Sequence, residues 1–179
     1  MTVSSSANIP KLSLHTLLTL DGYVADPTRI EAANLNIEPL SQYMLDRSDA
    51  LVLGRPTYLS LVDNGVWPYP NHLTYVLSRH KDWSLEQPQL HGSTESLSTL
   101  LPQMTEHDIQ NVWLMGGRRL VMAALAEHQL DELIIHLLPI TQSSGKPFFD
   151  QHHLSHFELI HVERLEQGIV RMQYHVSYD

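Results

Sequence analysis

The sequence contains no cysteine, and this absence removes several kinds of chemistry. Disulfide bonds, iron–sulfur clusters, thiolate zinc sites and thiol nucleophiles all require the cysteine side chain. Positive charge is also scarce, because 11 lysine and arginine residues face 20 aspartate and glutamate residues, which gives a formal net charge of -9. A nucleic-acid-binding surface needs clustered cations to neutralise phosphates. We therefore expect no nucleic-acid partner, although this charge still permits a local phosphate pocket.

Long apolar runs are missing as well. No run approaches the about 18 residues that a membrane-spanning helix needs. Residues 1–7 are serine-rich and lack the basic and apolar regions of a signal peptide. We therefore expect a cytoplasmic protein with no membrane partner. The length of 179 residues and the 42% hydrophobic share fit one globular domain, with residues 1–10 as a flexible N-terminus and residues 11–179 as the domain.

Three further motifs are absent. The sequence has neither the GxGxxG fingerprint of Rossmann dehydrogenases nor the GxxxxGK[ST] phosphate loop, and no GxSxG nucleophile elbow marks a hydrolase. Of its 12 histidines, only His152, His153 and His156 form a dense group. No glutamate lies between them as in the HExxH zinc motif, and histidines in loops are commonly solvated. We therefore expect no metal site.

The order of the expected elements indicates the fold class. Apolar runs predict strands over residues 11–20, 50–53, 73–77, 89–92, 112–115 and 131–140. Helical spacing or a helix start predicts helices over 39–47, from 56, over 96–104 and over 118–128. Loops are expected over 24–38, 63–72 and 141–150, and the alternation around Gln167-Gly168 predicts a hairpin of residues 157–165 and 169–177. This order predicts an α/β fold with a mostly parallel sheet flanked by helices and an antiparallel edge.

The stretch Leu-Gly-Arg-Pro-Thr-Tyr, residues 53–58, stands where a predicted strand opens into a helix. Such a junction presents free backbone N–H groups and a partial positive charge, so Gly54, Arg55 and Thr57 are candidates for holding a phosphate. The plain alternative is a helix start with a surface arginine.

A second junction is Val-Trp-Leu-Met-Gly-Gly-Arg-Arg, residues 112–119. Gly116 and Gly117 allow a ligand to approach the backbone closely, and the following helix start suits a pyrophosphate. Arg118 lies where the helix dipole disfavours a cation, a misfit that a bound anion would relieve. The alternative is a simple tight turn.

Ser78 and Arg79 follow another predicted strand and form a plausible clamp for a further phosphate, such as the 2′-phosphate of NADPH. An ordinary polar loop is the alternative reading. Three such sites together are more informative than one, because ligands of open α/β sheets bind at the carboxyl ends of the strands.

Four stretches in this order resemble the reductase domain of the bifunctional riboflavin-biosynthesis enzyme and its dihydrofolate-reductase relatives. They are Leu20-Asp21-Gly22-Tyr23-Val24-Ala25, residues 53–58, Leu77-Ser78-Arg79 and residues 112–117. Residues 130–133, 139–140 and 144–149 are similar to the same family, so the resemblance covers nearly the whole chain from Lys11.

The resemblance implies a three-layer dihydrofolate-reductase-like fold, a homodimer, and NADPH lying along the strand ends. Gly54, Arg55, Thr57, Ser78 and Arg79 would lie near its phosphates, with Gly116-Gly117 at the central turn. Asp21 would face the substrate beside the nicotinamide and is the candidate catalytic group, although Asp21-Gly22 also reads as a plain turn.

The zinc ligands of the family's deaminase domain are absent from the sequence, so we do not expect the bifunctional form. We expect an NADPH-dependent reductase of a small soluble substrate, with pterin-like and pyrimidine-like molecules as the options. The alternative is a protein that binds NADPH without turnover. Apolar residues in both phases of 157–176 predict that the C-terminal strands carry the homodimer contact.

Overall fold

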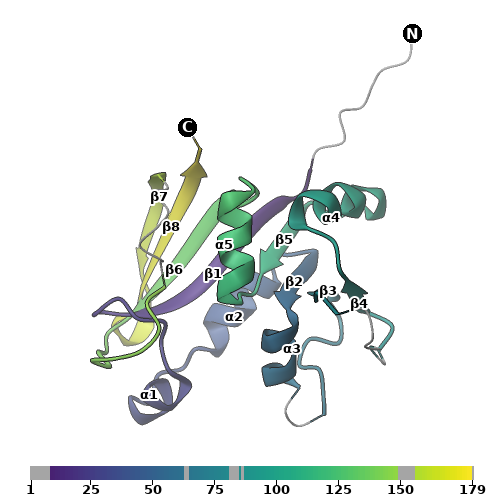
Figure 1. The fold of residues 1–179 in the computed structure, drawn as a ribbon. Coiled ribbons are helices and arrows are strands. Elements are labelled where there is room, and N and C mark those ends of the chain that lie inside the picture. The colour runs from purple at the N-terminus through teal and green to yellow at the C-terminus, as the bar shows by residue number, and fades with distance from the viewer. Residues whose placement is uncertain (1–8, 63–64, 81–84, 86, 149–155, 179) are drawn as a thin grey trace.

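The computed structural model describes residues 9–62, 65–80, 85, 87–148 and 156–178. They form an eight-stranded sheet in the order β4-β3-β2-β5-β1-β6-β8-β7 (Figure 1). The strands are β1 Lys11–Thr19, β2 Ala50–Gly54, β3 Leu73–Leu77, β4 Leu90–Ser93, β5 Asn111–Leu114, β6 Glu132–Leu138, β7 His156–Arg164 and β8 Val170–Ser177. The helices are α1 Pro27–Ala32, α2 Glu38–Leu45, α3 Arg55–Leu61, α4 Leu97–Met104 and α5 Arg118–Ala126, with short 3-10 turns at Thr105–His107 and Glu166–Gly168.

The sheet has the predicted mixture of pairings. Strands β4, β3, β2, β5, β1 and β6 pair in parallel, while β8 is antiparallel to both β6 and β7. The terminal hairpin turns at Gln167 and Gly168, whose φ angles of 55° and 77° are the positive values that a tight hairpin turn uses. The predicted α/β architecture with an antiparallel edge is therefore confirmed.

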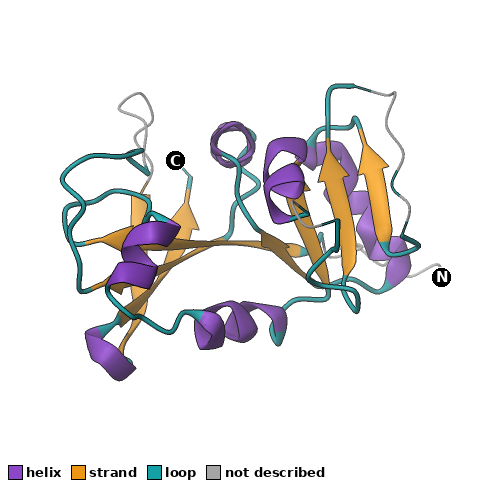
Figure 2. Cartoon of the chain, turned by 90° about the horizontal axis from the view of Figure 1, so that it is seen from below, coloured by secondary structure: helices purple, strands orange, loops and turns teal. Residues whose placement is uncertain are grey.

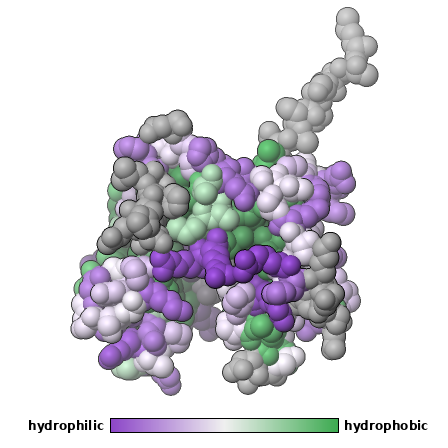
Figure 3. Space-filling model, viewed as in Figure 1, coloured by the Kyte–Doolittle hydropathy of each residue, from purple (hydrophilic) through white to green (hydrophobic). Residues whose placement is uncertain are grey.

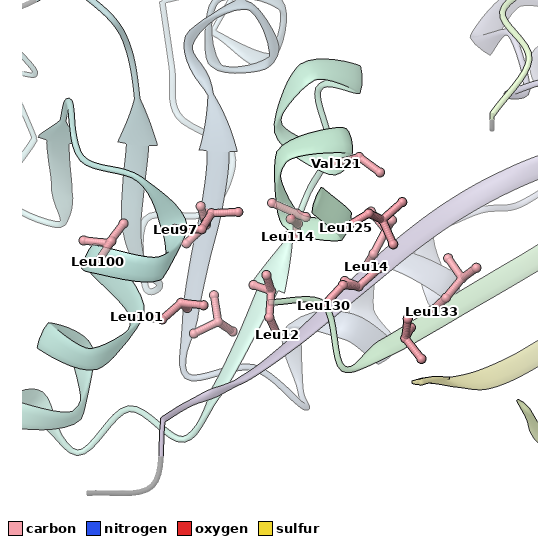
Figure 4. Packing of buried hydrophobic residues seen from close by; sticks show 14 of the residues in the cluster. Leu12, Leu14, Leu97, Leu100, Leu101, Leu114, Val121, Leu125, Leu130 and Leu133 are labelled. Atoms are coloured by element: carbon pink, nitrogen blue, oxygen red, sulfur yellow. The ribbon is translucent and has the colours of Figure 1, made fainter. Parts of the chain in front are cut away.

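Alternation along β1 separates two cores. Leu12 and Leu14 point to the face that α4 and α5 cover, where Leu97, Leu101 and Leu125 pack against the sheet (Figure 4). On the opposite face, Met44 of α2 and the half-buried Tyr58 of α3 pack with Leu51, Leu53 and Trp113. Helices therefore lie on both sides of the sheet, which completes three layers (Figure 2).

One expectation about the chain was wrong, because residues 24–38 are not all loop. They contain helix α1, and the Asp26 carboxylate caps it by accepting hydrogen bonds from the backbone N–H and hydroxyl of Thr28. Pro27 suits the first turn, where its missing N–H costs nothing. The expected flexible N-terminus falls largely on residues 1–8, and His152 and His153 likewise lie outside the described residues.

Candidate functional site

The parallel register brings the predicted site residues to one edge of the sheet. Gly54 at the end of β2 pairs with Leu77 at the end of β3, and Ser78 and Arg79 follow directly. In the centre of the sheet, Leu14 of β1 pairs with Leu114 of β5. The turns that follow these strands, including Gly116-Gly117 and Asp21, therefore share the carboxyl edge, where open α/β sheets bind ligands.

Two of the predicted motifs lie side by side. A Cβ atom built on Gly117 would lie 3.3 Å from Oγ1 of Thr57 and 3.9 Å from the backbone nitrogen of Gly54. The φ angles of Gly116 and Gly117 are 112° and 97°, a region that residues with a side chain rarely adopt. The glycines are therefore required by the backbone, and they leave the surface of this turn bare where it meets the start of α3.

Helix α5 begins directly after this turn, with Gly117 as its N-cap and no side-chain cap. The backbone N–H groups of Leu120 and Val121 donate to the Gly117 carbonyl at 2.8 and 3.0 Å. Arg118 and Arg119 are exposed at this helix start. The partial positive charge of an uncapped N-terminus next to two arginines favours an anion.

Helix α3 starts in the same way. Gly54 is its N-cap, without a side-chain cap, and Arg55 and Thr57 in the first turn are half-buried. Figure 3 shows a strongly hydrophilic band across the middle of the face where Figure 1 places the starts of α3 and α5. The two junctions thus form one polar surface.

The Ser78-Arg79 pair lies beside this surface. The backbone N–H of Ser78 donates to the Ser93 carbonyl at 2.9 Å, which fixes the strand end. Its Oγ accepts a hydrogen bond from the His80 N–H at 3.1 Å, so the hydroxyl hydrogen remains the donor that a phosphate oxygen needs. Arg79 is exposed.

Asp21 anchors a loop. Its carboxylate accepts hydrogen bonds from the Thr19 hydroxyl at 2.6 Å and from the Ser143 and Gln142 N–H groups at 2.8 and 3.2 Å. The hydrogen bond from Thr19, followed by those from the two backbone groups, lowers the pKa of Asp21. Asp21 is therefore ionised at neutral pH and ties the end of β1 to the chain after β6. This geometry fits an anchoring role better than that of a proton donor.

A polar pair that no sequence motif predicts lies on the face that α2 covers. Nε2 of His15 and Nδ1 of His136 are 2.7 Å apart, and the His15 ring also lies 5.8 Å from the Trp113 ring, measured between centroids. The three residues come from β1, β6 and β5. No motif links them, because only the pairing register of the parallel strands brings together residues so far apart in the sequence.

Two other kinds of feature are absent from the described parts of the chain. Those parts contain no cluster of three or more metal-binding side chains. None of their helices combines the length and apolar character needed to span a bilayer.

The model of the RibD C-terminal domain matches residues 10–171. The chain belongs to this family. Among curated proteins, the uncharacterized protein YwjB of Bacillus subtilis is 30% identical over 104 residues, which are 58% of this chain and 59% of that protein. The chain thus aligns with less than two thirds of this relative.

Solved structures share the fold. A putative riboflavin biosynthesis protein from Shewanella superposes with a TM-score of 0.76 at 21% identity, covering 94% of this chain and 99% of that one. RibD of Acinetobacter baumannii superposes with a TM-score of 0.69 at 18% identity, covering 97% of this chain and 59% of that one. Dihydrofolate reductase of Enterococcus faecalis, solved with NADP(H), superposes with a TM-score of 0.64 at 15% identity, covering 94% of this chain and 97% of that one. The fold is therefore that of dihydrofolate reductase.

Proposed function

We propose that the protein is a cytoplasmic, NADPH-dependent reductase of a small soluble substrate, with pterin-like or pyrimidine-like molecules as the options. The observation that carries the proposal is the close approach of the Gly117 turn to Thr57 and Gly54, because it brings two uncapped helix starts together at the ligand-binding edge, where they would form one anion-binding surface. Membership of a reductase family supports the same reading.

The residues present fit this cofactor. At Gly117, a Cβ would fill part of the space between the two turns, so a bare backbone here allows close approach of a pyrophosphate. The N-terminus of α5, with Arg118, would hold that group, and Arg55 and Thr57 would contribute further donors. Ser78 and Arg79 would be the donors for the 2′-phosphate. When bound, NADPH supplies the hydride, and the chain binds and orients it.

Asp21 supports this site without donating a proton. As an ionised carboxylate with three donors, it fixes the position of Gln142, whose side-chain amide donates to the Val24 carbonyl at 3.1 Å and accepts from the Asp26 N–H at 3.1 Å. The loops that follow the neighbouring strands β1 and β6 are thereby held together. We propose that this bridge shapes the substrate side of the site.

Isothermal titration calorimetry with NADPH and NADH tests the cofactor assignment. NADPH should bind at least tenfold more tightly, a difference of only about 1.4 kcal/mol, which one charge-assisted contact supplies. Arg79→Ala should remove most of this preference. Arg164→Ala is the matched control, because Arg164 is exposed at the far edge strand β7. Equal affinity of wild type for both cofactors would refute the 2′-phosphate assignment.

Turnover is tested separately by following NADPH oxidation with candidate acceptors. Steady oxidation that Arg55→Ala abolishes would support the reductase. Tight NADPH binding without oxidation of any pterin or pyrimidine acceptor would favour the non-catalytic alternative.

We also propose a homodimer. On the edge strand β7, Leu159, Ile160 and Val162 are exposed by 51%, 52% and 57%. An exposed apolar edge strand invites pairing with another chain, and a two-fold partner is its commonest cover. Met172 and Tyr174 on β8 pack against the core, so β7 provides the free apolar surface.

A further inference from the structure

The His15–His136 pair lies close to the carboxyl edge. His15 follows Leu14, which pairs with Leu114 of β5. Met115 and Gly116 follow Leu114 along the chain. His136 pairs with Leu17 of β1. The pair therefore lies within a few residues of the Gly116-Gly117 turn, on the face that α2 covers.

Both imidazoles are uncharged at neutral pH. Burial, and then the neighbouring His136, lower the pKa of His15 to about 3. Burial, and then the charge of Arg171, lower the pKa of His136 to about 4. A hydrogen bond of 2.7 Å between two neutral rings requires that one nitrogen donates and the other accepts. Two arrangements of the protons are therefore possible, and the surroundings decide between them.

The surroundings of His136 favour one arrangement. Its Nε2 is buried and has no hydrogen-bond partner among the described residues. Arg171 is the cross-strand neighbour of His136 on β8, and its guanidinium lies over the Tyr43 ring at 3.8 Å. A positive charge nearby favours a lone pair rather than an N–H at Nε2, and an orphaned buried N–H is the rarer arrangement in proteins. The proton of His136 is then on Nδ1, which donates to Nε2 of His15.

This arrangement puts the single proton of His15 on Nδ1. That atom makes no hydrogen bond with the described residues, and the His15 side chain is only partly buried. The Trp113 ring, whose centroid lies 5.8 Å from that of His15, is buried. Two residues further along the same face of β1, Leu17 lines a cavity of about 450 Å³ with Ala25, Ile30 and Ile37.

We propose that His15 presents an uncharged Nδ1–H donor to a carbonyl oxygen or ring nitrogen of the substrate, and that His136 is the positioning residue that fixes this tautomer. The proposal rests on the proposed function, because it assigns the substrate side of the same site. A neutral imidazole donor suits an uncharged acceptor atom.

The first test is the tautomer in the ligand-free protein. Long-range ¹H–¹⁵N NMR spectra distinguish Nδ1–H from Nε2–H imidazoles, and the signals missing in His15→Leu and His136→Leu assign the pair. We expect Nδ1–H for both residues near neutral pH. An Nε2–H tautomer at His15 would overturn the proposal, whatever the protein does with NADPH.

The second test uses uracil as the probe, because its carbonyl oxygens are the required acceptors. Uracil at millimolar concentration should shift the His15 imidazole signals saturably. His136→Leu should weaken uracil binding about tenfold, whereas His136→Asn should restore most of it, because the asparagine amide N–H can replace the Nδ1–H donor. Absence of any His15 shift, or equal binding by the leucine and asparagine variants, would overturn the assignment.

NADPH titration of the same samples separates the two proposals. We expect NADPH affinity to stay within twofold of wild type in both His136 variants. If wild type binds uracil at His15 but no NADPH, the proposed function fails while the His15 site stands. If NADPH binds and is oxidised but uracil does not change the His15 NMR signals, the reductase stands and the His15 assignment fails.

Discussion

Replacement of Gly117 by alanine tests the turn at which the two predicted motifs meet. A residue with a side chain at a φ of 97° costs about 1–2 kcal/mol. The new Cβ would lie 3.3 Å from Oγ1 of Thr57. This contact is tight, so the short Thr57 side chain must shift by a few tenths of an ångström to accommodate the Cβ. For a domain of this size, about 1 kcal/mol lowers Tm by roughly 2–4 °C. We therefore expect a Tm about 2–8 °C below wild type and a folded protein.

Gly168→Ala is the matched control for backbone strain. Gly168 has a φ of 77° and lies in the hairpin turn, where its Cβ would meet Pro139 at an ordinary 3.7 Å. In thermal unfolding followed by circular dichroism, both variants should lose stability, and Gly168→Ala should lose somewhat less because it lacks the tight contact. NADPH at 100 times its Kd stabilises a binding-competent protein by about 2.7 kcal/mol. Gly168→Ala should show this rise in Tm and Gly117→Ala should not. Equal rises in both variants would refute the close approach of the cofactor to Gly117.

Three further predictions concern the core, the histidine pair and the edge strand. Leu114→Ala, at a fully buried position between β1 and β2, should lower the free energy of unfolding by about 2.7–5.0 kcal/mol in urea titrations. The pKa values of His15 and His136 are lowered in the folded chain, so on acidification the unfolded chain protonates these residues before the folded chain does. The stability that the neutral pair contributes is therefore full above about pH 6.5 and is lost as the pH falls toward 4. The stability of the double variant His15→Leu/His136→Leu should decline less over that range. Light scattering should give twice the chain mass of 20.4 kDa, and Leu159→Lys/Val162→Lys should give a folded monomer.

Each of these outcomes has a clear opposite. A loss below about 1 kcal/mol for Leu114→Ala would contradict its tight packing. The histidine argument fails if the double leucine variant loses stability between pH 6.5 and 4 as steeply as wild type. A wild-type mass near that of one chain at micromolar concentration would exclude the dimer.

The buried strands were the most predictable part of the fold. Residues 73–77 were predicted with the bounds that the structure has, because a short apolar run between polar segments is typical of a buried strand. Helix α1 was missed because six residues are too short for a helical period to show. Its start was still signalled by Asp26-Pro27-Thr28, a capping residue followed by a first-turn proline.

The site was predictable only in part. Glycines and arginines after strands are visible in the sequence, and the parallel register then placed Gly54, Ser78 and Gly117 on one edge. The partners of Asp21 and the His15–His136 pair depend on which residues lie opposite each other on neighbouring strands. Nothing local records that register, so these roles emerge only from the folded chain.

The most direct test of the account is the map of backbone amide NMR shifts on addition of NADPH. We predict the largest changes at Gly54, Gly116 and Gly117, with smaller ones at Ser78. A second cavity, of about 470 Å³, is lined by residues of β3, β4 and α4, including Tyr75 and His91. The amide shifts of these residues should not change. Changes confined to Tyr75 and His91, or no changes at saturating NADPH, would contradict the assignment of the carboxyl edge as the cofactor site.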